Sequence, residues 1–227
     1  MTSIEVVIVK AEDTHEWLKK RHYAKAVPII QHSFGLYFDG VLSGVCTFGP
    51  PPRVMNRGKS LFNGEADIDT YELNRLVVRD GLPDNTLSQF LSRSLRMLPK
   101  PCVIVSYADG NQGHHGYIYQ ATNWLYCGET LREPRYLNTQ TGKKLHPRTV
   151  YSMFGTRDIE RMPSHIEIIK EENTKHRYVK LMVGKKLRRR LLSHLRYDVL
   201  PYPKGENTRY EAGEIASTKR SFGAWFD

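Results

Sequence analysis

The pattern of hydrophobic and polar positions in the first third of the chain predicts strands and one short helix. Residues 4–10 (IEVVIVK) are rich in β-branched side chains and predict a first strand. Residues 13–21 predict a helix, with Asp13 as its cap and Glu16 as the capping-box partner. HSFGLYF and VLSGVCTF then predict a β-hairpin around the two-residue turn Asp39-Gly40.

The middle of the chain has the clearest periodicities. Residues 53–68 are polar and contain glycine, which predicts a loop, whereas TYELNRLVV (70–78) predicts a strand. A helix follows from Asn85 or Thr86, because its apolar positions recur at helical spacing and form one face. These positions are Leu87, Phe90, Leu91, Leu95 and Leu98.

A continuous apolar run, CVIVSYAD (102–109), predicts a buried central strand, and residues 110–124 predict a helix after it. LREPRYLN and TVYSMFG predict further short strands, and a basic helix is expected between Gly184 and Tyr197. The order of these elements predicts an α/β protein with a mixed sheet flanked by helices. We expect a catalytic domain over 1–160, and a basic C-terminal helical extension over 161–227 packed on it.

The charge and the cysteine content of the chain indicate its partners and its compartment. The formal net charge is +10, with a pI of about 9.5, so the protein should attract polyanions such as DNA, RNA or an anionic membrane surface. Cys46, Cys102 and Cys127 lie far apart without CxxC spacing, which predicts buried thiols in a reducing cytoplasm. The first residues lack the features of a signal peptide, and no apolar run is long enough for a membrane span.

Polar side chains lie on the two predicted central strands. Ser106, Tyr107 and Asp109 lie at the C-terminal end of strand 102–109, where open α/β sheets bind ligands. Asp109 is a candidate general base or metal ligand, and it could equally cap the next helix. Strict alternation places Glu72 and Arg75 on opposite faces of strand 70–78, as substrate contacts or as a structural ion pair.

The segment after Asp109 contains further candidates. Tyr117 and Tyr119 are candidate proton donors or stacking partners, although packing in the core is the expectation for one of them. Asn123 can pair with the N6/N7 edge of adenine, and Trp124 either offers a stacking face or belongs to the core. His114 and His115 must point in different directions, so joint metal binding is not expected, and one of them is a candidate cap or DNA contact.

The predicted basic helix has a stripe of leucines and a broad cationic surface. No acidic residue lies between 180 and 197, which favours contact with a phosphate backbone over a merely solvated face. The candidate contacts are Lys185, Lys186, Arg188, Arg189, Arg190 and Arg196.

The order ELNRLVV, turn, helix, CVIVSYAD, helix and NWLYCG resembles the GNAT acyltransferase fold over roughly residues 30–155. This resemblance implies a centrally splayed sheet with the donor in the gap, and it places Asn111 and Tyr117 or Tyr119 at the site. The turn RDGLPDNTLSQ departs from the family. It has one glycine, a proline that removes a donor, and Asp80 and Asp84, so ordinary pyrophosphate binding is not expected.

The segment SYADGNQGHHGYIYQATNWLYCG, together with ELNRLVV and YDVLPYPKG, resembles the phage Mom family over most of residues 20–205. That resemblance implies conversion of adenine in duplex DNA to its N6-carbamoylmethyl derivative, which protects phage DNA from host restriction. It also makes His22 and Tyr23 candidate substrate contacts or part of an iron site. Taken together, the residue patterns and the resemblances give a candidate catalytic set of Ser106, Asp109, Tyr23, Tyr117 and Tyr119. The candidate substrate contacts are His22, Glu72, Arg75, Tyr107, Asn111, Asn123 and Trp124.

Other functions stay open on the sequence alone. One is coenzyme A-dependent N-acetylation of a small amine or protein, and another is non-catalytic DNA binding on a GNAT-like fold. Donor and metal are both undetermined: the candidates are glycyl-tRNA, whose glycyl group matches the atoms that Mom proteins add, an acyl-CoA, and iron. Double-stranded DNA is the expected partner and tRNA and a second copy of the chain are candidates, in the cytoplasm of a phage-infected or prophage-bearing bacterium.

Overall fold

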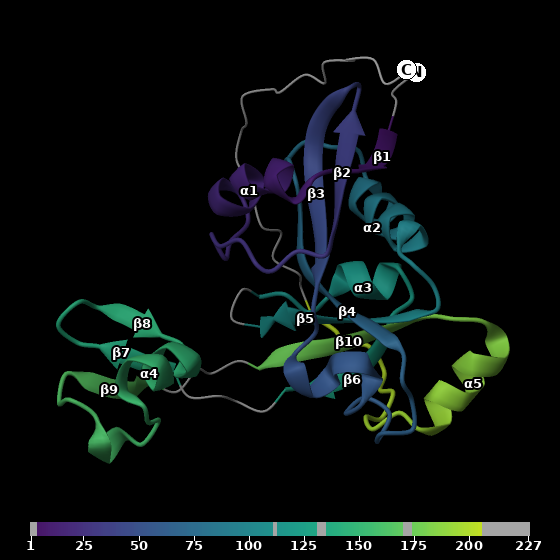
Figure 1. Ribbon diagram of the computed structural model, residues 1–227. Coiled ribbons are helices and arrows are strands. Elements are labelled where there is room, and N and C mark those ends of the chain that lie inside the picture. The colour runs from purple at the N-terminus through teal and green to yellow at the C-terminus, as the bar shows by residue number, and fades with distance from the viewer. Residues whose placement is uncertain (1–3, 111–112, 131–134, 170–173, 206–227) are drawn as a thin grey trace, which may run out of the picture.

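The computed structural model describes residues 4–110, 113–130, 135–169 and 174–205. Its main body is a seven-stranded sheet with helices on both faces, and a small three-stranded unit lies beside it (Figure 1). All neighbouring strands of the large sheet are antiparallel except β4 and β5. In spatial order the strands are β1 (Ile4–Ile8), β2 (His32–Phe38), β3 (Val41–Gly49), β4 (Asp69–Val78), β5 (Cys102–Asp109), β10 (Lys175–Met182) and β6 (Leu125–Glu129).

Helices cover both faces because the strands bury apolar side chains on each side. On one face, α2 (Thr86–Met97) and α3 (Tyr117–Ala121) enclose a core that includes Phe90 and Trp124. On the other face, α1 (Ala11–Lys20) packs on β3 and β4. The remaining half of that face is covered by the segment that contains the 3-10 turn η1 (Arg53–Gly58), and by α5 (Lys185–Ser193).

The parallel strands β4 and β5 separate partway along their length. Their pairing runs from Asp69–Cys102 to Glu72–Val105 and then stops, although both strands continue. The Ser106 hydroxyl bridges the start of the gap, with Oγ 2.9 Å from the carbonyl oxygen of Leu73. The expectation of a mixed, centrally splayed sheet flanked by helices is therefore confirmed.

A β-bulge at Asn74 changes which side chains of β4 share a face. Arg75 pairs with Thr47 and Leu73 pairs with Phe48, so Asn74 is the extra residue. Strict alternation therefore gave the wrong result for Glu72 and Arg75. These two side chains lie on one face, close enough for each charge to influence the pKa of the other.

The bulge also holds the loop that follows α1. The Asn74 side chain accepts a hydrogen bond from Thr47 Oγ1 at 2.6 Å and donates one to the carbonyl oxygen of Ile29 at 3.1 Å. Arg75 donates from Nε to the carbonyl oxygen of Ala26 at 3.3 Å. Gly49 permits this close crossing, because a Cβ there would lie 2.1 Å from the Ile29 oxygen.

Several predicted elements differ from the structure. TVYSMFG is not a strand but most of helix α4 (Pro147–Phe154), whose Pro147, Val150 and Phe154 spacing is helical. Residues 53–68 are not an open polar loop, since Leu61 and Phe62 are fully buried. The helix predicted over 110–124 is confined to α3. Asp13 is not the N-cap of α1, which is Lys10, but it lies in the first turn and accepts the Lys10 N–H at 3.2 Å.

The small unit lies between β6 and β10 in the chain. It consists of β7 (Arg135–Asn138), β8 (Lys143–Leu145), α4, the 3-10 turn η3 (Ile159–Arg161) and β9 (Ile166–Ile169). The expected domain boundary at residue 160 falls within this unit, and β10 lies beyond it in the centre of the large sheet. The tertiary structure of 161–205 is thus shared between both sheets and α5 rather than being one appended segment.

The three cysteines are free and buried, as expected. Within the part of the chain that the structure describes, no helix is both long enough and apolar enough to cross a membrane.

We expect Gly49→Ala to destabilise the protein. Its Cβ would clash with the Ile29 carbonyl and with the Asn74 amide, 2.6 Å away, so the crossing loop must shift at a cost of about 1–3 kcal/mol. Denaturant unfolding measures the loss. Gly184→Ala is the control, because its Cβ would meet no atom within 4 Å and the change of helix cap should cost less than about 1 kcal/mol. Equal stability of Gly49→Ala and the wild type would show that the crossing does not depend on this glycine.

Candidate functional site

Three aromatic rings from distant segments meet beside the gap between β4 and β5. His22 follows α1, and its ring centroid lies 4.3 Å from that of Tyr23. The Tyr23 ring contacts His114 edge-on, with centroids 5.7 Å apart. His114 follows β5, so this contact joins the loop after α1 to the C-terminal end of the central strand.

Charged groups surround these rings. Burial raises the pKa of Tyr23, and the nearby charge of Asp109 raises it further. Burial lowers the pKa of His114, and Asp109 opposes that shift. Burial lowers the pKa of Arg75, and Tyr23 and Glu72 oppose that shift. Tyr23 therefore lies within range of a charge from each central strand, Arg75 of β4 and Asp109 of β5. Glu72 lies close to Arg75 on the same strand.

Two hydroxyl groups occupy the gap itself. Ser106 Oγ lies 2.8 Å from the hydroxyl of Tyr119, as well as 2.9 Å from the Leu73 carbonyl oxygen. A serine hydroxyl has one proton. If Ser106 donates to the carbonyl, Tyr119 must donate to Ser106. Tyr117 has a different position, since its side chain is 66% exposed and points away from the core.

Three cations lie near the carboxylate of Glu72. Burial raises its pKa, and the charges of Arg75, Lys175 and Arg148 each lower it. Lys175 comes from β10, where it pairs with Asp109, and Arg148 comes from α4 of the small unit. Glu72 thus connects three separate parts of the fold.

His22 is held in its neutral form. Burial lowers its pKa to about 3, and the charges of Arg75, His114 and Lys25 act in the same direction. Its Nδ1 accepts the backbone N–H of Ala24 at 3.1 Å, which places the ring proton on Nε2. His22 can therefore donate a hydrogen bond from Nε2 at neutral pH.

The other predicted contacts do not join the Ser106–Tyr119 pair in the gap. Tyr107 projects to the face of the sheet opposite to Ser106, where its hydroxyl lies 3.4 Å from Met55 Sδ and burial raises its pKa to about 12. Trp124 is 1% exposed and packs against Tyr119 in the core, with centroids 5.1 Å apart. Asn123 is exposed, and its backbone oxygen accepts from Lys180. Asn111 lies outside the described residues.

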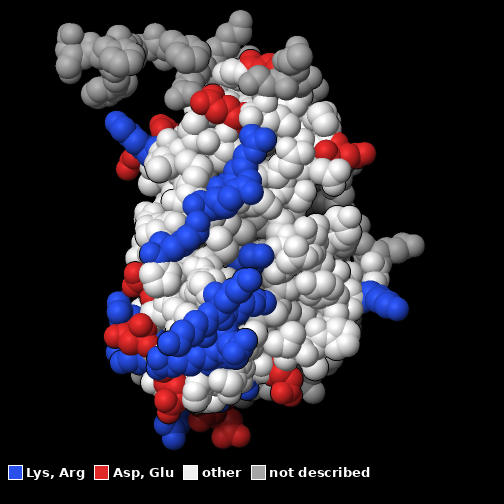
Figure 2. Space-filling view, turned by 90° about the vertical axis from the view of Figure 1, so that its right-hand side faces the viewer, with Lys and Arg blue, Asp and Glu red and all other residues white. Residues whose placement is uncertain are grey.

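Helix α5 has a strongly cationic exposed surface. Lys185, Lys186, Arg189 and Arg190 are exposed, while Leu191 faces the core. Arg190 also donates to the carbonyl oxygen of Glu65 at 3.0 Å, which ties the helix to the segment after η1. Figure 2 faces the side of the molecule on which α5 lies and shows Lys and Arg side chains gathered in broad bands across it. Arg188 is half-buried, and exposed Arg196 lies just beyond the helix.

The turn before α2 does not fit a pyrophosphate group in the usual GNAT manner. The Thr86 N–H already donates to the Pro83 carbonyl at 3.2 Å, and the cap residue Asn85 has a left-handed backbone with φ of 65°. Asp80 and Asp84 add negative charge. Among the described residues, no group of three or more His, Cys, Asp or Glu could hold a metal ion.

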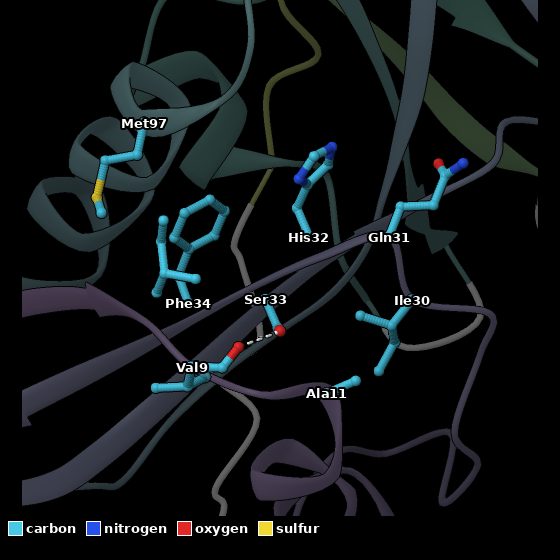
Figure 3. Close-up of a pocket in the computed structure, with 9 residues that line it drawn as sticks. Val9, Ala11, Ile30, Gln31, His32, Ser33, Phe34 and Met97 are labelled. Atoms are coloured by element: carbon cyan, nitrogen blue, oxygen red, sulfur yellow. Dashed lines mark hydrogen bonds between the residues drawn. The ribbon is translucent and has the colours of Figure 1, made fainter.

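A pocket of about 240 Å³ lies elsewhere, between the start of α1, the start of β2 and Met97 (Figure 3). His32, Ser33 and Phe34 line it, and the Ser33 hydroxyl donates to the Val9 carbonyl at 2.7 Å. None of the residues at the gap contributes to this pocket, so we do not assign it to the candidate site.

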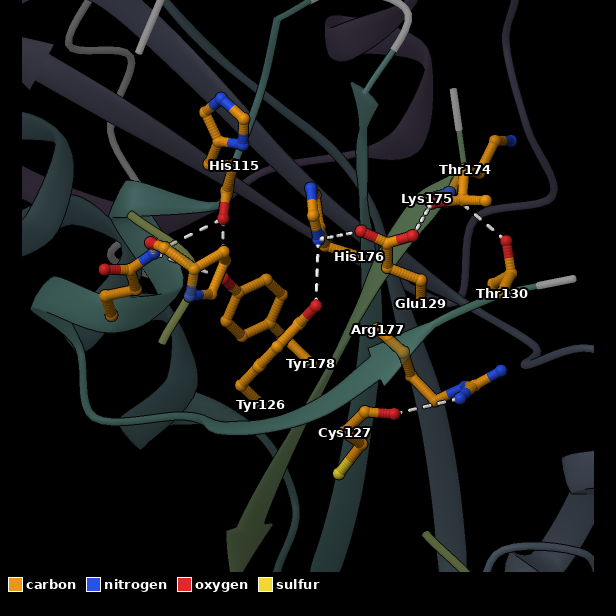
Figure 4. A network of polar contacts seen from close by, with 12 residues as sticks. His115, Tyr126, Cys127, Glu129, Thr130, Thr174, Lys175, His176, Arg177 and Tyr178 are labelled. Atoms are coloured by element: carbon orange, nitrogen blue, oxygen red, sulfur yellow. Dashed lines mark hydrogen bonds and ion pairs between the residues drawn. The ribbon is translucent and has the colours of Figure 1, made fainter. Parts of the chain in front are cut away.

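A polar network beside the gap fixes the segment that carries His114 (Figure 4). The Tyr178 hydroxyl donates to the His115 carbonyl at 2.5 Å, and the His115 ring lies 5.5 Å from that of His176. His176 Nδ1 in turn lies 3.0 Å from the Tyr126 hydroxyl. A Cβ at Gly116 would lie 2.3 Å from the Tyr178 ring, so the chain can turn here only because residue 116 is glycine.

Sequence reasoning left His114, Lys175 and Arg148 out of the site. The paired histidines indicate that one must face away from the other, but nothing local shows that His114 reaches Tyr23. Lys175 reaches the site only through the pairing of β10 with β5, and Arg148 only through the position of the small unit.

The splayed strands, with α2 connecting them and the Ser106–Tyr119 hydroxyl pair in the gap, define a fold of the GNAT-like class. Within that class, the chain belongs to the Mom protein family, whose model matches residues 3–204.

No protein of curated function matches the chain. Solved structures with a similar arrangement include yncA of Salmonella typhimurium, an assigned acetyltransferase solved with acetyl-CoA, at 10% identity and a TM-score of 0.43 over 79% of this chain and 94% of that one. An N-acetyltransferase of Staphylococcus aureus Mu50 has 13% identity and a TM-score of 0.42 over 79% and 99%. A tandem GNAT protein of clavulanic acid biosynthesis has 10% identity and a TM-score of 0.41 over 62% and 50%.

We expect His22→Asn to reduce the pH dependence of stability. The unfolded chain takes up a proton on His22 near its ordinary pKa of 6.5, whereas the folded protein does so only near 3. The free energy of unfolding therefore decreases as the pH falls from 6.5 towards 3, by about 2 kcal/mol at pH 5. Denaturant unfolding at pH 7.5 and pH 5 measures this loss.

Asparagine keeps an acceptor near the position of Nδ1 for the Ala24 N–H, which makes the substitution conservative. His15→Asn, on α1, controls for the loss of a histidine elsewhere. If His22→Asn and the wild type lose the same stability between the two pH values, the assignment of a neutral His22 is wrong.

Proposed function

We propose that this protein transfers an acyl or aminoacyl group to the N6 amine of adenine in DNA and so forms N6-carbamoylmethyladenine. In a phage genome this modification would protect the DNA from host restriction. Membership of the Mom family supports the reaction. The observation that carries the proposal is the convergence of Tyr23, Asp109 and the Ser106–Tyr119 pair at the gap between β4 and β5.

The chemistry requires a base and a group that stabilises an oxyanion. The N6 amine is a poor nucleophile because its lone pair is delocalised into the ring, so orientation and proton removal are needed. Asp109 is the group we assign to accept that proton. Neutral His22 and permanently charged Arg75 are suited to stabilise negative charge on the acyl oxygen.

Glycyl-tRNA is the donor that we favour, because the added group has the atoms of glycine amide. N6 attacks the glycyl ester carbon, the ester C–O bond breaks, and the tRNA hydroxyl leaves with a proton. The free glycyl amine then attacks C6 of the base and the bond from C6 to the original nitrogen breaks. That nitrogen becomes the terminal amide, so the second step is an isomerisation without loss of atoms.

Base flipping is part of the proposal because the target amine lies inside the stacked duplex. Extrusion of the adenine costs roughly a few kcal/mol, which contacts in the protein must offset. The gap between β4 and β5 supplies the polar groups that would receive the extruded base, and the basic surface supplies attraction for the backbone.

Two other functions receive less support. Coenzyme A-dependent acetylation of a small amine or protein is disfavoured by the turn before α2, where Thr86 already uses its N–H and two aspartates lie nearby. Binding of DNA without catalysis is disfavoured by the polar groups clustered at the gap, which a scaffold alone does not need.

We expect Asp109→Asn to lower adenine modification by a factor of about 100 or more, because general-base catalysis contributes factors of that size. Mass spectrometry of nucleosides, after incubation of purified protein with DNA and glycyl-tRNA, measures the product. Asp39→Asn in the hairpin turn is the matched control and should keep full activity, since asparagine tolerates its φ of 50°. Product with acetyl-CoA but none with glycyl-tRNA would refute the proposed donor.

We expect replacement of Arg188, Arg189 and Arg190 by alanine to weaken DNA binding and to flatten its salt dependence. Loss of three phosphate contacts should reduce the slope of log K against log salt by about 2–3. Fluorescence anisotropy across a salt titration measures it. A triple variant with alanine at Lys10, Lys19 and Lys20 removes equal charge from the α1 region. If both triple variants show the same slope, α5 is not a specific contact.

A further inference from the structure

The small unit presents one face of α4 to solvent. Pro147, Val150 and Phe154 pack towards its own core, which leaves the side with Arg148 and Tyr151 exposed. These two residues lie three positions apart and are therefore neighbours on the helix surface. The Tyr151 ring is 57% exposed, which is unusual for a large aromatic side chain in a small folded unit.

A second arginine flanks the same ring. The guanidinium of Arg157 lies 5.8 Å from the centroid of Tyr151. The backbone of Arg157 is fixed in turn, because its carbonyl oxygen accepts the hydroxyl of buried Tyr136 at 2.8 Å. An exposed tyrosine thus has one arginine against its ring and another one helical turn away.

The small unit as a whole is positively charged, like the α4 face. Residues 135–169 contain six Lys or Arg against three Asp or Glu. Arg148 also lies within range of the Glu72 carboxylate, whose pKa its charge lowers, so this face lies on the side of the small unit that is turned to the candidate site.

We propose that the face formed by Arg148, Tyr151 and Arg157 binds the DNA strand next to the target adenine. The guanidinium groups bind phosphates, and Tyr151 stacks on a base that has lost its neighbour when the adenine is extruded. This inference rests on the proposed function and adds a second DNA contact to it, separate from α5.

The two basic surfaces are built for different contacts. Helix α5 (KKLRRRLLS) contains no aromatic residue and offers cations alone, which suits an intact duplex backbone. The α4 face combines cations with a ring, which is the combination that binds unstacked nucleotides. An opened DNA strand beside the reacting base matches the position and chemistry of this face.

The test compares Tyr151→Ala with the wild type on two short DNA duplexes, one fully paired and one with an abasic site opposite an adenine. We expect Tyr151→Ala to weaken binding to the opened duplex about tenfold and binding to the paired duplex much less, because only the opened duplex offers an unstacked base to the ring. Tyr151→Phe should restore binding. Met153→Ala, an equally exposed α4 variant, should leave it unchanged.

Circular dichroism of each variant checks that the fold is intact. Equal binding of Tyr151→Ala and the wild type to the opened duplex would overturn the proposal. So would a loss of Tyr151→Ala binding that is seen only when tRNA replaces DNA as the ligand. Adenine modification is measured on the same samples. If the wild type makes no adduct but Tyr151→Ala still loses binding to opened DNA, the proposed adenine modification is wrong. The proposed DNA-binding face on α4 is then still supported.

Discussion

The separation of β4 from β5 is the constraint on which the rest of the site depends. Parallel pairing ends at Glu72 and Val105, so backbone groups beyond that point need other partners. The Leu73 carbonyl takes the Ser106 hydroxyl, and the Ser106 oxygen then accepts from Tyr119. A backbone requirement thus places two hydroxyl groups in the gap and links the central strand to α3.

On its other edge, β4 also has to bend away from regular pairing. There the strand stays paired with β3, and the Asn74 bulge absorbs the bend. Because the bulge leaves Asn74 without a partner on β3 and turns Arg75 to the face of Glu72, both side chains can hold the carbonyl groups of the loop that follows α1. That loop carries His22 and Tyr23, so one irregular position in β4 connects the shape of the sheet to the rings at the site.

Much of this arrangement could be predicted from local patterns, and the failures have physical causes. The Asp-Gly turn and the apolar run 102–109 located the hairpin and β5 correctly, because both signals are local. The faces of Glu72 and Arg75 were wrong because alternation assumes an unbroken ladder. Helix α4 was read as a strand because Val150 and Tyr151 favour sheets, although Pro147 and Gly155 mark helix ends. The place of His114 depends on the Tyr178 contact, which no sequence spacing reveals.

The cations around the gap matter for the proposed reaction on DNA. A bound nucleic acid would raise the pKa of nearby carboxyl groups, as burial does, and both effects oppose the ionised form that a base requires. At Glu72 the charges of Arg75, Lys175 and Arg148 act in the other direction. The net effect is still that burial raises the pKa of Glu72, because it outweighs these three charges. Lys175 also pairs with Asp109 across β5 and β10, so one of the three cations lies on the strand next to the carboxylate that we assign as the base. On the proposed function, the basic residues around the gap would both attract DNA and oppose the further rise in the pKa of Glu72 that bound DNA would cause.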